Sequence, residues 1–366
     1  MIPTSDVVAR KPPPEVTRVR PRGSVVDLFC GAGGLAHGFK LERFDVVAGY
    51  DVDEACRYPF EHNNHAPFVR RDVSDLGASE LNGLFYPGEP RILVGCAPCQ
   101  PFSIYNSKND DPKWRLVSKF ADLIVEAQPD VVSMENVPRL LAFDGGRVFE
   151  GFAARLRGAG YHVHHEIVYL PNYGLAQRRS RLVLLASRLG PIRLEAPTTP
   201  PEQHATVWDA IGDLPPIGAG ETHPADRIHV SAGLTEINLR RIRASRPGGT
   251  WREWDEDLVA DCHKTEKGRS YDCVYSRMRA DHPAPTITTQ FYGFGTGRFG
   301  HPEQDRALSI REGAILQSFP RDYAFVKPGD QVRVHTLGRM IGNAVPVLLG
   351  RAIARSVEAH IREANA

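Results

Sequence analysis

A cysteine held between two prolines is the feature of this sequence best suited to covalent chemistry. The segment Gly95–Ser103 reads GCAPCQPFS and follows the apolar run Arg91–Val94, which is typical of a buried strand. In open α/β sheets, ligands bind in the loops at the carboxyl ends of such strands. Pro98 and Pro101 stiffen the backbone around Cys99. Rigid presentation of one thiol is what covalent catalysis requires, so Cys99 is predicted to be a nucleophile.

The pair Cys96-x-x-Cys99 has other interpretations. Half of a zinc site would need two further ligands, and the remaining cysteines form no second close pair in the sequence. A thioredoxin-like redox motif opens a helix, whereas the flanking prolines favour a loop. Most cysteines are small buried hydrophobic residues, so a structural role stays open from the motif alone. No metal is predicted.

Composition indicates an ordinary globular protein. The chain has 366 residues, which exceeds one typical hydrophobic core and predicts two domains. Because the formal net charge is only +1, a nucleic-acid partner would have to meet a local basic face. No apolar run reaches the roughly 20 residues of a membrane span, and the six scattered cysteines are expected to be free thiols in a reducing cytoplasm. Residues 1–23, rich in proline and arginine, are predicted to form a flexible tail.

A glycine-rich turn near the start of the ordered sequence predicts a cofactor site. The strand-like run Ser24–Phe29 enters Cys30–Phe39, where glycines open a helix. Glycine lets a ligand approach the backbone, and a helix N-terminus offers free N–H groups. A nucleotide-type cofactor is therefore expected. The glycine spacing departs from the dinucleotide fingerprint G-x-G-x-x-G, which argues against NAD.

Acidic residues recur where predicted strands end. Asp51 follows the strand Asp45–Tyr50 and suits a pair of ribose hydroxyls, while Asp72 follows Phe68–Val69 and suits an amino group of adenine. Each acid alone is more typical of a turn or a helix cap, but their repetition favours a cofactor. Glu135 ends the apolar strand Pro129–Met134, which suits a proton donor, with an exposed turn residue as the alternative.

Arginines mark two further segments. Those of Gln177–Arg181 precede the strand Leu182–Ala186 and indicate an anionic ligand or a base edge, unless they form a solvated turn. The segment Arg240–Arg252 holds five arginines and no acid, which predicts a surface that follows phosphates, although charge runs are usually just solvated.

Strands and helices alternate up to Ser187, which predicts a mostly parallel, doubly wound α/β sheet. The following chain is rich in proline and glycine, so we assign residues 24–188 and 325–366 to one domain and residues 189–324 to a second, smaller one. The closing stretch Leu337–Val347 is expected to lead into a helix that runs to about Ala364, with Pro346 in its first turn.

Six motifs in order give the chain, from about Ser24 to Ala354, a resemblance to the bacterial DNA cytosine-5 methyltransferases of restriction–modification type. The motifs are a cofactor loop (Asp27–Gly34, DLFCGAGG), a nucleophile loop (Pro98–Ser103, PCQPFS), an acidic motif (Glu135–Val137, ENV), a Gln-x-Arg-x-Arg motif (Gln177–Arg181, QRRSR), a segment before the closing helix (Arg311–Pro320) and a return to the cofactor (Gly342–Pro346, GNAVP).

This resemblance implies a Rossmann-like fold that binds S-adenosylmethionine. The chain departs from the family at two positions: Asp51 stands where glutamate is frequent, and Ile315 where arginine is frequent. The cofactor-binding residues that the resemblance implies are Phe29, Gly31, Gly33, Gly34, Leu35, Asp51, Val52, Asp72, Val73, Pro98, Leu116, Asn343 and Val345.

The resemblance also implies a mechanism. Cys99 would add to carbon 6 of a flipped-out cytosine, Glu135 would act on ring nitrogen 3, and Arg181 with Arg179 would hold the carbonyl oxygen. The second domain would be the target-recognition domain. The residues expected to contact DNA are Gln100, Ser103, Arg240, Arg241, Arg243, Thr286 and Thr288.

The resulting prediction is a sequence-specific DNA methyltransferase, monomeric and in a bacterial cytoplasm, with a cognate restriction endonuclease acting independently. A tRNA cytosine-5 methyltransferase of the same superfamily and a non-catalytic DNA-binding regulator are the alternatives. The sizeable second domain favours DNA, because reading base edges requires dedicated surface. The joint presence of Cys99, Glu135 and Arg181 argues against the regulator.

Overall fold

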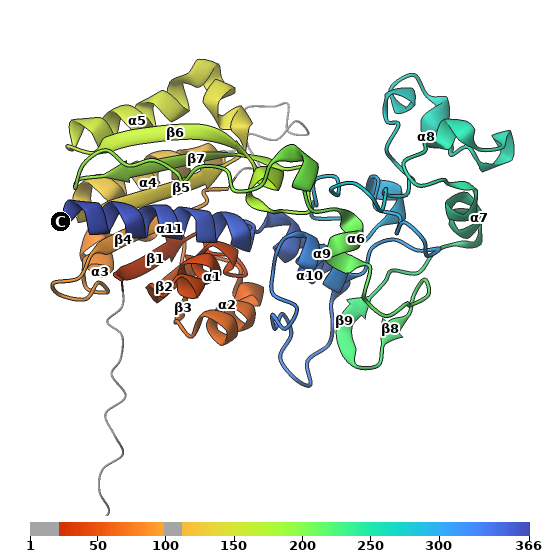
Figure 1. Cartoon of the computed structure of the whole chain (residues 1–366), viewed down its shortest axis with the longest axis horizontal. Coiled ribbons are helices and arrows are strands. Elements are labelled where there is room, and N and C mark those ends of the chain that lie inside the picture. Colours follow the sequence, from red (N-terminus) through yellow and green to blue (C-terminus); the bar gives the residue numbers. More distant parts are fainter. Residues whose placement is uncertain (1–21, 99–111) are drawn as a thin grey trace, which may run out of the picture.

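The computed structural model describes residues 22–98 and 112–366, and in these ranges a seven-stranded sheet forms the centre (Figure 1). The strand order is β3-β2-β1-β4-β5-β7-β6. Strands β1 to β5 pair in parallel, whereas β7 runs antiparallel to both neighbours. The predicted mostly parallel, doubly wound sheet is confirmed. The strands are β1 (Ser24–Leu28), β2 (Asp45–Asp51), β3 (Phe68–Arg70), β4 (Arg91–Gly95), β5 (Val131–Asn136), β6 (His162–Tyr169) and β7 (Ser180–Ser187).

Helices cover both faces of the sheet because its central strands are apolar on both sides. Val25 belongs to the core beneath α1 and α11, and its neighbour Val26 to the core beneath α4 and α5, as the alternation of side chains along a strand requires. The helices of this layer are α1 (Gly34–Leu41), α2 (Arg57–Asn64), α3 (Ala78–Asn82), α4 (Arg115–Ala127), α5 (Arg147–Gly158), α10 (Val334–Asn343) and α11 (Val347–Ala364).

The last helix packs beside the first. A Cβ atom on Gly38 of α1 would collide with the backbone of Gly350 in α11, so the two helices cross at backbone contact. The C-terminal segment therefore completes the layer that the N-terminal segment begins (Figure 1).

The closing helix is divided. The structure ends α10 at Asn343 and begins α11 at Val347, with Pro346 as the residue before the first turn instead of within it. A proline disfavours the helical conformation of the residue before it and lacks an N–H for the helical ladder, which accounts for the break at Ala344–Pro346.

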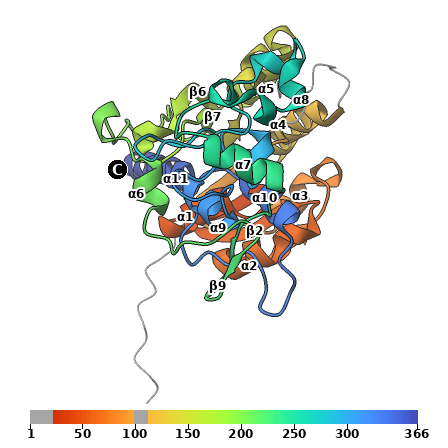
Figure 2. The same ribbon diagram turned by 90° about the vertical axis from the view of Figure 1, so that its right-hand side faces the viewer.

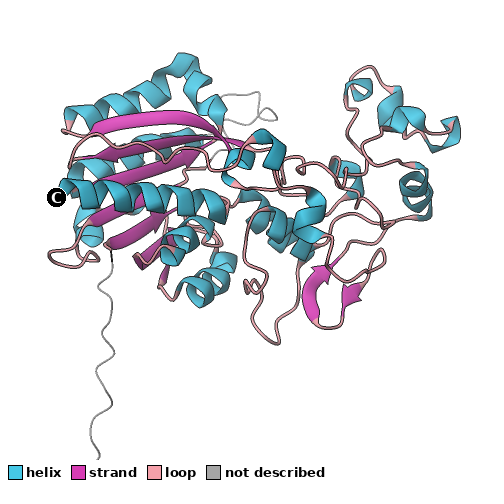
Figure 3. Cartoon of the chain, viewed as in Figure 1, coloured by secondary structure: helices cyan, strands magenta, loops and turns pink. Residues whose placement is uncertain are grey.

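The chain between β7 and α10 forms a lobe beside the sheet layer (Figure 1). It is mostly loop (Figure 3), and Figure 2 faces it with α7 in front and α8 above. Its first residues still contact the sheet layer, because the backbone N–H of Glu195 donates to Ser356 and its carboxylate pairs with Arg355, both on α11. The division into two domains stays a prediction. The lobe elements are α6 (Val207–Ile211), β8 (Thr222–His223), β9 (Asp226–Val230), α7 (Glu236–Ala244), α8 (Asp261–Lys264) and α9 (Ile310–Leu316).

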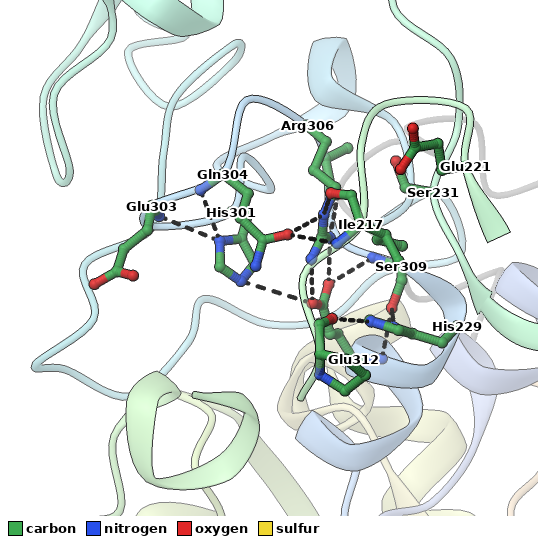
Figure 4. A network of polar contacts seen from close by, with 12 residues as sticks. Ile217, Glu221, His229, Ser231, His301, Glu303, Gln304, Arg306, Ser309 and Glu312 are labelled. Atoms are coloured by element: carbon green, nitrogen blue, oxygen red, sulfur yellow. Dashed lines mark hydrogen bonds and ion pairs between the residues drawn. The ribbon is translucent and has the colours of Figure 1, made fainter. Parts of the chain in front are cut away.

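A buried ion pair within the lobe joins Arg306 to α9 (Figure 4). The Nη1 and Nη2 atoms of Arg306 lie 2.8 and 2.6 Å from the two carboxylate oxygens of Glu312, and both side chains are inaccessible to solvent. Glu312 also accepts from the backbone N–H of Ser309, whose hydroxyl caps α9 in return. Burial alone would raise the pKa of Glu312, but the bonds from Arg306 hold it below its usual value.

His301 lies against this pair. Its Nδ1 accepts from the backbone N–H groups of Glu303 and Gln304, so the ring hydrogen belongs on Nε2, 3.6 Å from a Glu312 oxygen. Burial lowers the pKa of His301 to about 4, since the nearby carboxylate does not offset the desolvation of the ring. The folded protein therefore holds a neutral His301 well below the histidine pKa of 6.5.

Acid should destabilise the fold through His301. Below pH 6.5 the unfolded chain binds a proton at this residue while the folded chain does not until about pH 4, so stability falls as the pH falls through that window. His301→Gln should weaken this dependence of stability on pH. The free energy of unfolding lost between pH 7 and pH 4, measured by urea unfolding, should be smaller than in the wild type by up to about 3 kcal/mol. His335→Gln, at an exposed position of α10, is the matched control. If the unfolding free energy of His301→Gln fell with pH as steeply as that of the wild type, this account would be contradicted.

Candidate active site

A cavity of about 360 Å³ opens at the carboxyl ends of β1, β2 and β4, next to the point where the strand order reverses. Ligands of doubly wound sheets bind at such switch points. Of the predicted cofactor residues, Gly33 and Gly34 are not in the wall of this cavity. The predicted residues that line it are Phe29, Gly31, Leu35, Asp51, Val52, Asp72, Val73, Pro98, Leu116, Asn343 and Val345.

Gly31, Gly33 and Gly34 of the turn are required for different structural reasons. Gly33 has a φ of 88° and precedes the first turn of α1, while a Cβ on Gly34 would collide with the carbonyl oxygen of Val345. Gly31 has a φ of 50°, and a Cβ there would meet no atom within 4 Å. Gly31 therefore leaves room on the cavity wall that a side chain would fill.

Backbone donors orient Asp51. Its Oδ2 accepts from the N–H of Gly31 and its Oδ1 from the N–H of Asp53, each at 2.9 Å. Burial raises the pKa of Asp51, partly offset by these bonds. A carboxylate oxygen can accept more than one hydrogen bond, so Asp51 can still receive a hydroxyl group.

The cavity wall also combines apolar surface with a second acid. Phe29 lies edge-on to Phe120, with ring centroids 6.4 Å apart, and the side chain of Val52 is 57% exposed although it lines the cavity. Asp72 accepts from the backbone N–H and the hydroxyl of Ser74. The wall can thus hold a flat apolar ring that carries a polar edge.

Asp27 is a cavity residue that we did not assign as a site residue from the sequence. It is 1% exposed, and its Oδ2 has no hydrogen-bond partner in the ranges that the structure describes. Burial raises the pKa of Asp27 well above its usual value. The sequence placed Asp27 at the start of the cofactor-loop motif, but we did not predict a binding role for its side chain. The other lining residues that we did not assign are Cys30, Asp53, Cys56, Arg71, Cys96, Ala97, Lys113, Arg339, Met340 and Ala344.

Glu135 is the penultimate residue of β5, and its side chain is 2% exposed. The antiparallel register places Val183 of β7 opposite Glu135, so that Arg181 lies just beyond the pair. The Nε atom of Arg181 is 2.9 Å from Oε1 of Glu135. This contact is an ion pair, and Oε1 has no hydrogen-bond partner among the residues described.

Comparison with known proteins decides the family. The model of the C-5 cytosine-specific DNA methylase family matches residues 23–359. The chain belongs to this family. It is 51% identical over 337 residues to the type II methylase M.HgiDII of Herpetosiphon aurantiacus, covering 92% of this chain and 95% of that protein. It is 29% identical to the type II methyltransferase M1.HphI of Haemophilus parahaemolyticus, covering 91% and 86%.

A solved structure has the same fold. The Entamoeba histolytica methyltransferase EhMeth superposes with a TM-score of 0.62 at 14% identity, covering 93% of this chain and 99% of that chain. The methylases of this family use S-adenosylmethionine as the methyl donor.

In this methylase, Arg179 contacts the backbone of segments that follow β7 in the chain. Its guanidinium donates to the carbonyl oxygens of Ile287, Gly342 and Ala344, at 3.0 to 3.5 Å. These bonds connect the start of β7 with the lobe and with the break between α10 and α11. In this structure Arg179 binds backbone segments together.

Two glutamines complete that connection. Gln177 accepts from Arg179 and from the N–H of Ile287, and its Nε2 donates to Oε1 of Gln317. Gln317 in turn donates to the carbonyls of Ile341 and Ala344. We call the set of Gln177, Arg179 and Gln317 the glutamine–arginine cluster. The cluster satisfies buried backbone groups, and the expected contact of Arg179 with the base stays a prediction.

The predicted DNA contacts fall in different environments. Arg240 pairs with Asp257, Arg243 pairs with Asp305, and Arg241 donates to the carbonyl of Leu258. The acids that neutralise this run therefore come from other segments. Thr286 and Thr288 are exposed, beside the start of β7 and α10 respectively.

The predicted residues Cys99, Gln100 and Ser103 lie outside the described ranges. Within those ranges, no group of three or more histidine, cysteine or acidic side chains could hold a metal ion. None of the helices in the described part of the chain is long and apolar enough to cross a membrane.

Proposed function

We propose that this methylase transfers a methyl group from S-adenosylmethionine to carbon 5 of a cytosine flipped out of duplex DNA, through a covalent bond to Cys99. The observation that carries the proposal is the ion pair between the buried Glu135, near the end of β5, and Arg181, near the start of β7. This pair lies beside the acid-lined cavity. Because M.HgiDII is named a type II methylase, we further propose that the chain is the modification half of a restriction–modification system. It would act as a monomer in the bacterial cytoplasm, independently of the endonuclease.

The cavity fits the cofactor. S-adenosylmethionine carries a positive sulfonium, an amino group, a ribose and an adenine, and when bound it supplies an electrophilic methyl group. The Asp27 oxygen that has no partner among the described residues suits its cationic part, and Gly31 leaves space for close approach. Asp51 would hold the ribose hydroxyls and Asp72 the adenine amino group, with the ring against the apolar wall.

The base would be activated from both sides. Carbon 5 of cytosine is a weak nucleophile until a thiolate adds to carbon 6, which is the role assigned to Cys99. Oε1 of Glu135, which has no hydrogen-bond partner among the described residues, would bind ring nitrogen 3 and draw off the developing negative charge. Arg181 would hold Glu135 through Nε and present its remaining donors to the carbonyl oxygen. Carbon 5 then takes the methyl group, water acting as a base accepts the carbon 5 proton, and the electrons of that bond expel Cys99 as a thiolate and restore the ring.

The base must leave the stacked duplex for this chemistry. Unstacking costs a few kcal/mol, and contacts between the lobe and the DNA would offset that cost. Thr286 and Thr288 are the exposed candidates next to the site. The ion pairs of Arg240 and Arg243 would have to exchange their acids for phosphates.

One assay distinguishes the proposed function from its alternatives. The protein is incubated with methyl-labelled S-adenosylmethionine and either duplex DNA or tRNA. Label in DNA supports the proposal, label only in tRNA supports the RNA enzyme, and label in neither supports a non-catalytic regulator. The recognition sequence is then found by bisulfite sequencing of DNA from a host that expresses the protein.

In this assay Glu135→Gln should lower kcat by about 10²- to 10⁴-fold, because an amide cannot transfer a proton to nitrogen 3. The matched control is Glu202→Gln at an exposed position, which should keep the wild-type rate. Normal methylation by Glu135→Gln would exclude Glu135 as the acid.

A methyl group on the cavity wall should weaken cofactor binding. Gly31→Ala and Gly145→Ala both place alanine at a positive φ with open space around the new Cβ, so both should lose about 1 kcal/mol of stability. Only Gly31 lines the cavity, so only its variant should raise the Kd for S-adenosylmethionine in calorimetry. Equal Kd values in the two variants would place the cofactor elsewhere.

Duplex DNA with 5-fluorocytosine at the target should trap a covalent adduct, because fluorine cannot leave as a proton does. The adduct should form with the wild type and with Cys262→Ser, whose cysteine is exposed in the lobe, but not with Cys99→Ser. Denaturing electrophoresis reads the result directly. An adduct that survives in Cys99→Ser would show that another residue is the nucleophile.

A further inference from the structure

Cys96 contacts the group that the reaction depends on, although the mechanism above does not use it. The parallel register sets Gly95 of β4 opposite Met134 of β5, so the next residues, Cys96 and Glu135, are neighbours at the edge of the sheet. The thiol of Cys96 donates to Oε2 of Glu135, with sulfur and oxygen 2.9 Å apart. Cys96 also lines the cavity, so it stands between the cofactor site and Glu135.

The two partners of Glu135 differ in chemistry. Arg181, at Oε1, has only hydrogens to donate, so it favours the carboxylate. The thiol of Cys96 can donate to Oε2 both when Glu135 is ionised and when it carries its proton on Oε1, because a carbonyl oxygen accepts a hydrogen bond as well. With only 2% of the glutamate side chain exposed, water cannot replace a lost partner, and an unpaired polar atom there is costly.

We propose that Cys96 is a positioning residue that keeps the carboxyl group of Glu135 in one orientation through both of its protonation states. Oε1 then stays directed at the base while Oε2 stays on the sulfur. The contact itself is independent of the enzymatic activity. The catalytic consequence rests on the proposed function, in which Glu135 exchanges a proton with cytosine.

The neighbouring chain supports a fixed position for Cys96. Its backbone N–H donates to the carbonyl of Leu28 in β1, and the side-chain amide of Asn136 donates to the carbonyl of Ala97 at 3.0 Å. The loop that follows β4 is thus attached to strands on either side of it. The backbone at Cys96 is therefore held by the sheet.

Substitutions at Cys96 separate positioning from packing. Cys96→Ala removes both donor and acceptor and should lower kcat about tenfold, a typical value for a buried bond to a charged group. It should displace the pH profile of kcat toward higher pH, because the carboxylate loses a donor, while KM for the cofactor changes little. Cys96→Ser restores a donor and acceptor and should restore the profile. Cys262→Ala is the matched control.

A readout that needs no methyl transfer tests the contact. The holoprotein, free of DNA, is treated with iodoacetamide, and the alkylation rate of each cysteine is followed by peptide mass spectrometry. The Glu135 carboxylate opposes formation of the thiolate, so Glu135→Gln should speed alkylation of Cys96 several-fold and leave exposed Cys262 unchanged.

The outcomes are separable. An unchanged alkylation rate at Cys96 would overturn the contact, whatever the enzyme does. Faster alkylation together with wild-type kcat and pH profile in Cys96→Ala would overturn the positioning role. Failure of the proposed function would instead show as absence of label in DNA, with the coupling between Cys96 and Glu135 still measurable.

Discussion

The site depends on keeping one carboxyl group buried at the end of β5. A carboxyl group removed from water is costly unless charges and donors compensate for the lost hydration. Three adjacent strands supply that compensation: β5 carries Glu135, β4 ends next to Cys96 and β7 begins near Arg181. The reversed direction of β7 is essential, because it brings the first residues of that strand to the edge where the parallel strands end. A parallel strand at this position would begin at the opposite edge, far from the site.

The glutamine–arginine cluster connects the start of β7 to the break between α10 and α11. A break between two helices leaves carbonyl groups that the helical ladder does not satisfy. Arg179 and Gln317 donate to those carbonyls at Ala344, and Gln177 links both to the lobe at Ile287. The cluster therefore keeps the loop of Asn343 and Val345 against the cavity, although these residues lie more than 150 positions after β7 in the chain. The hydrogen bonds of the cluster satisfy buried backbone groups that would otherwise have no partner.

Opposite charges pair at close range both in the cavity wall and in the lobe. The cavity collects acids at successive strand ends, and Arg339 of α10 pairs with Asp53 at 2.7 Å on its wall. In the lobe, arginines and acids from separate segments pair at the surface, as the net charge of +1 requires on average. Exposed pairs of this kind are worth little energy, so an anionic backbone can compete for the arginines.

Local residue patterns determined the class of fold and the edge that carries the site. Apolar strand-like runs that alternate with helical segments predict a mostly parallel sheet. Asp51, Asp72 and Glu135 lie at or near the carboxyl ends of strands that share one edge of this sheet. Such features depend on neighbours in sequence, so they are readable without coordinates.

Tertiary structure decided which side chains meet. The contact of Cys96 with Glu135 depends on the register between β4 and β5. The bonds from Arg179 to backbone carbonyls depend on the break before α11, in a segment far from Arg179 in the sequence. The place of the Asp27 side chain on the cavity wall depends on how β1 packs, and the acids that pair with Arg240 and Arg243 lie outside their segment. Spacing along a chain carries no information on such pairings, because they are set by the packing of whole elements.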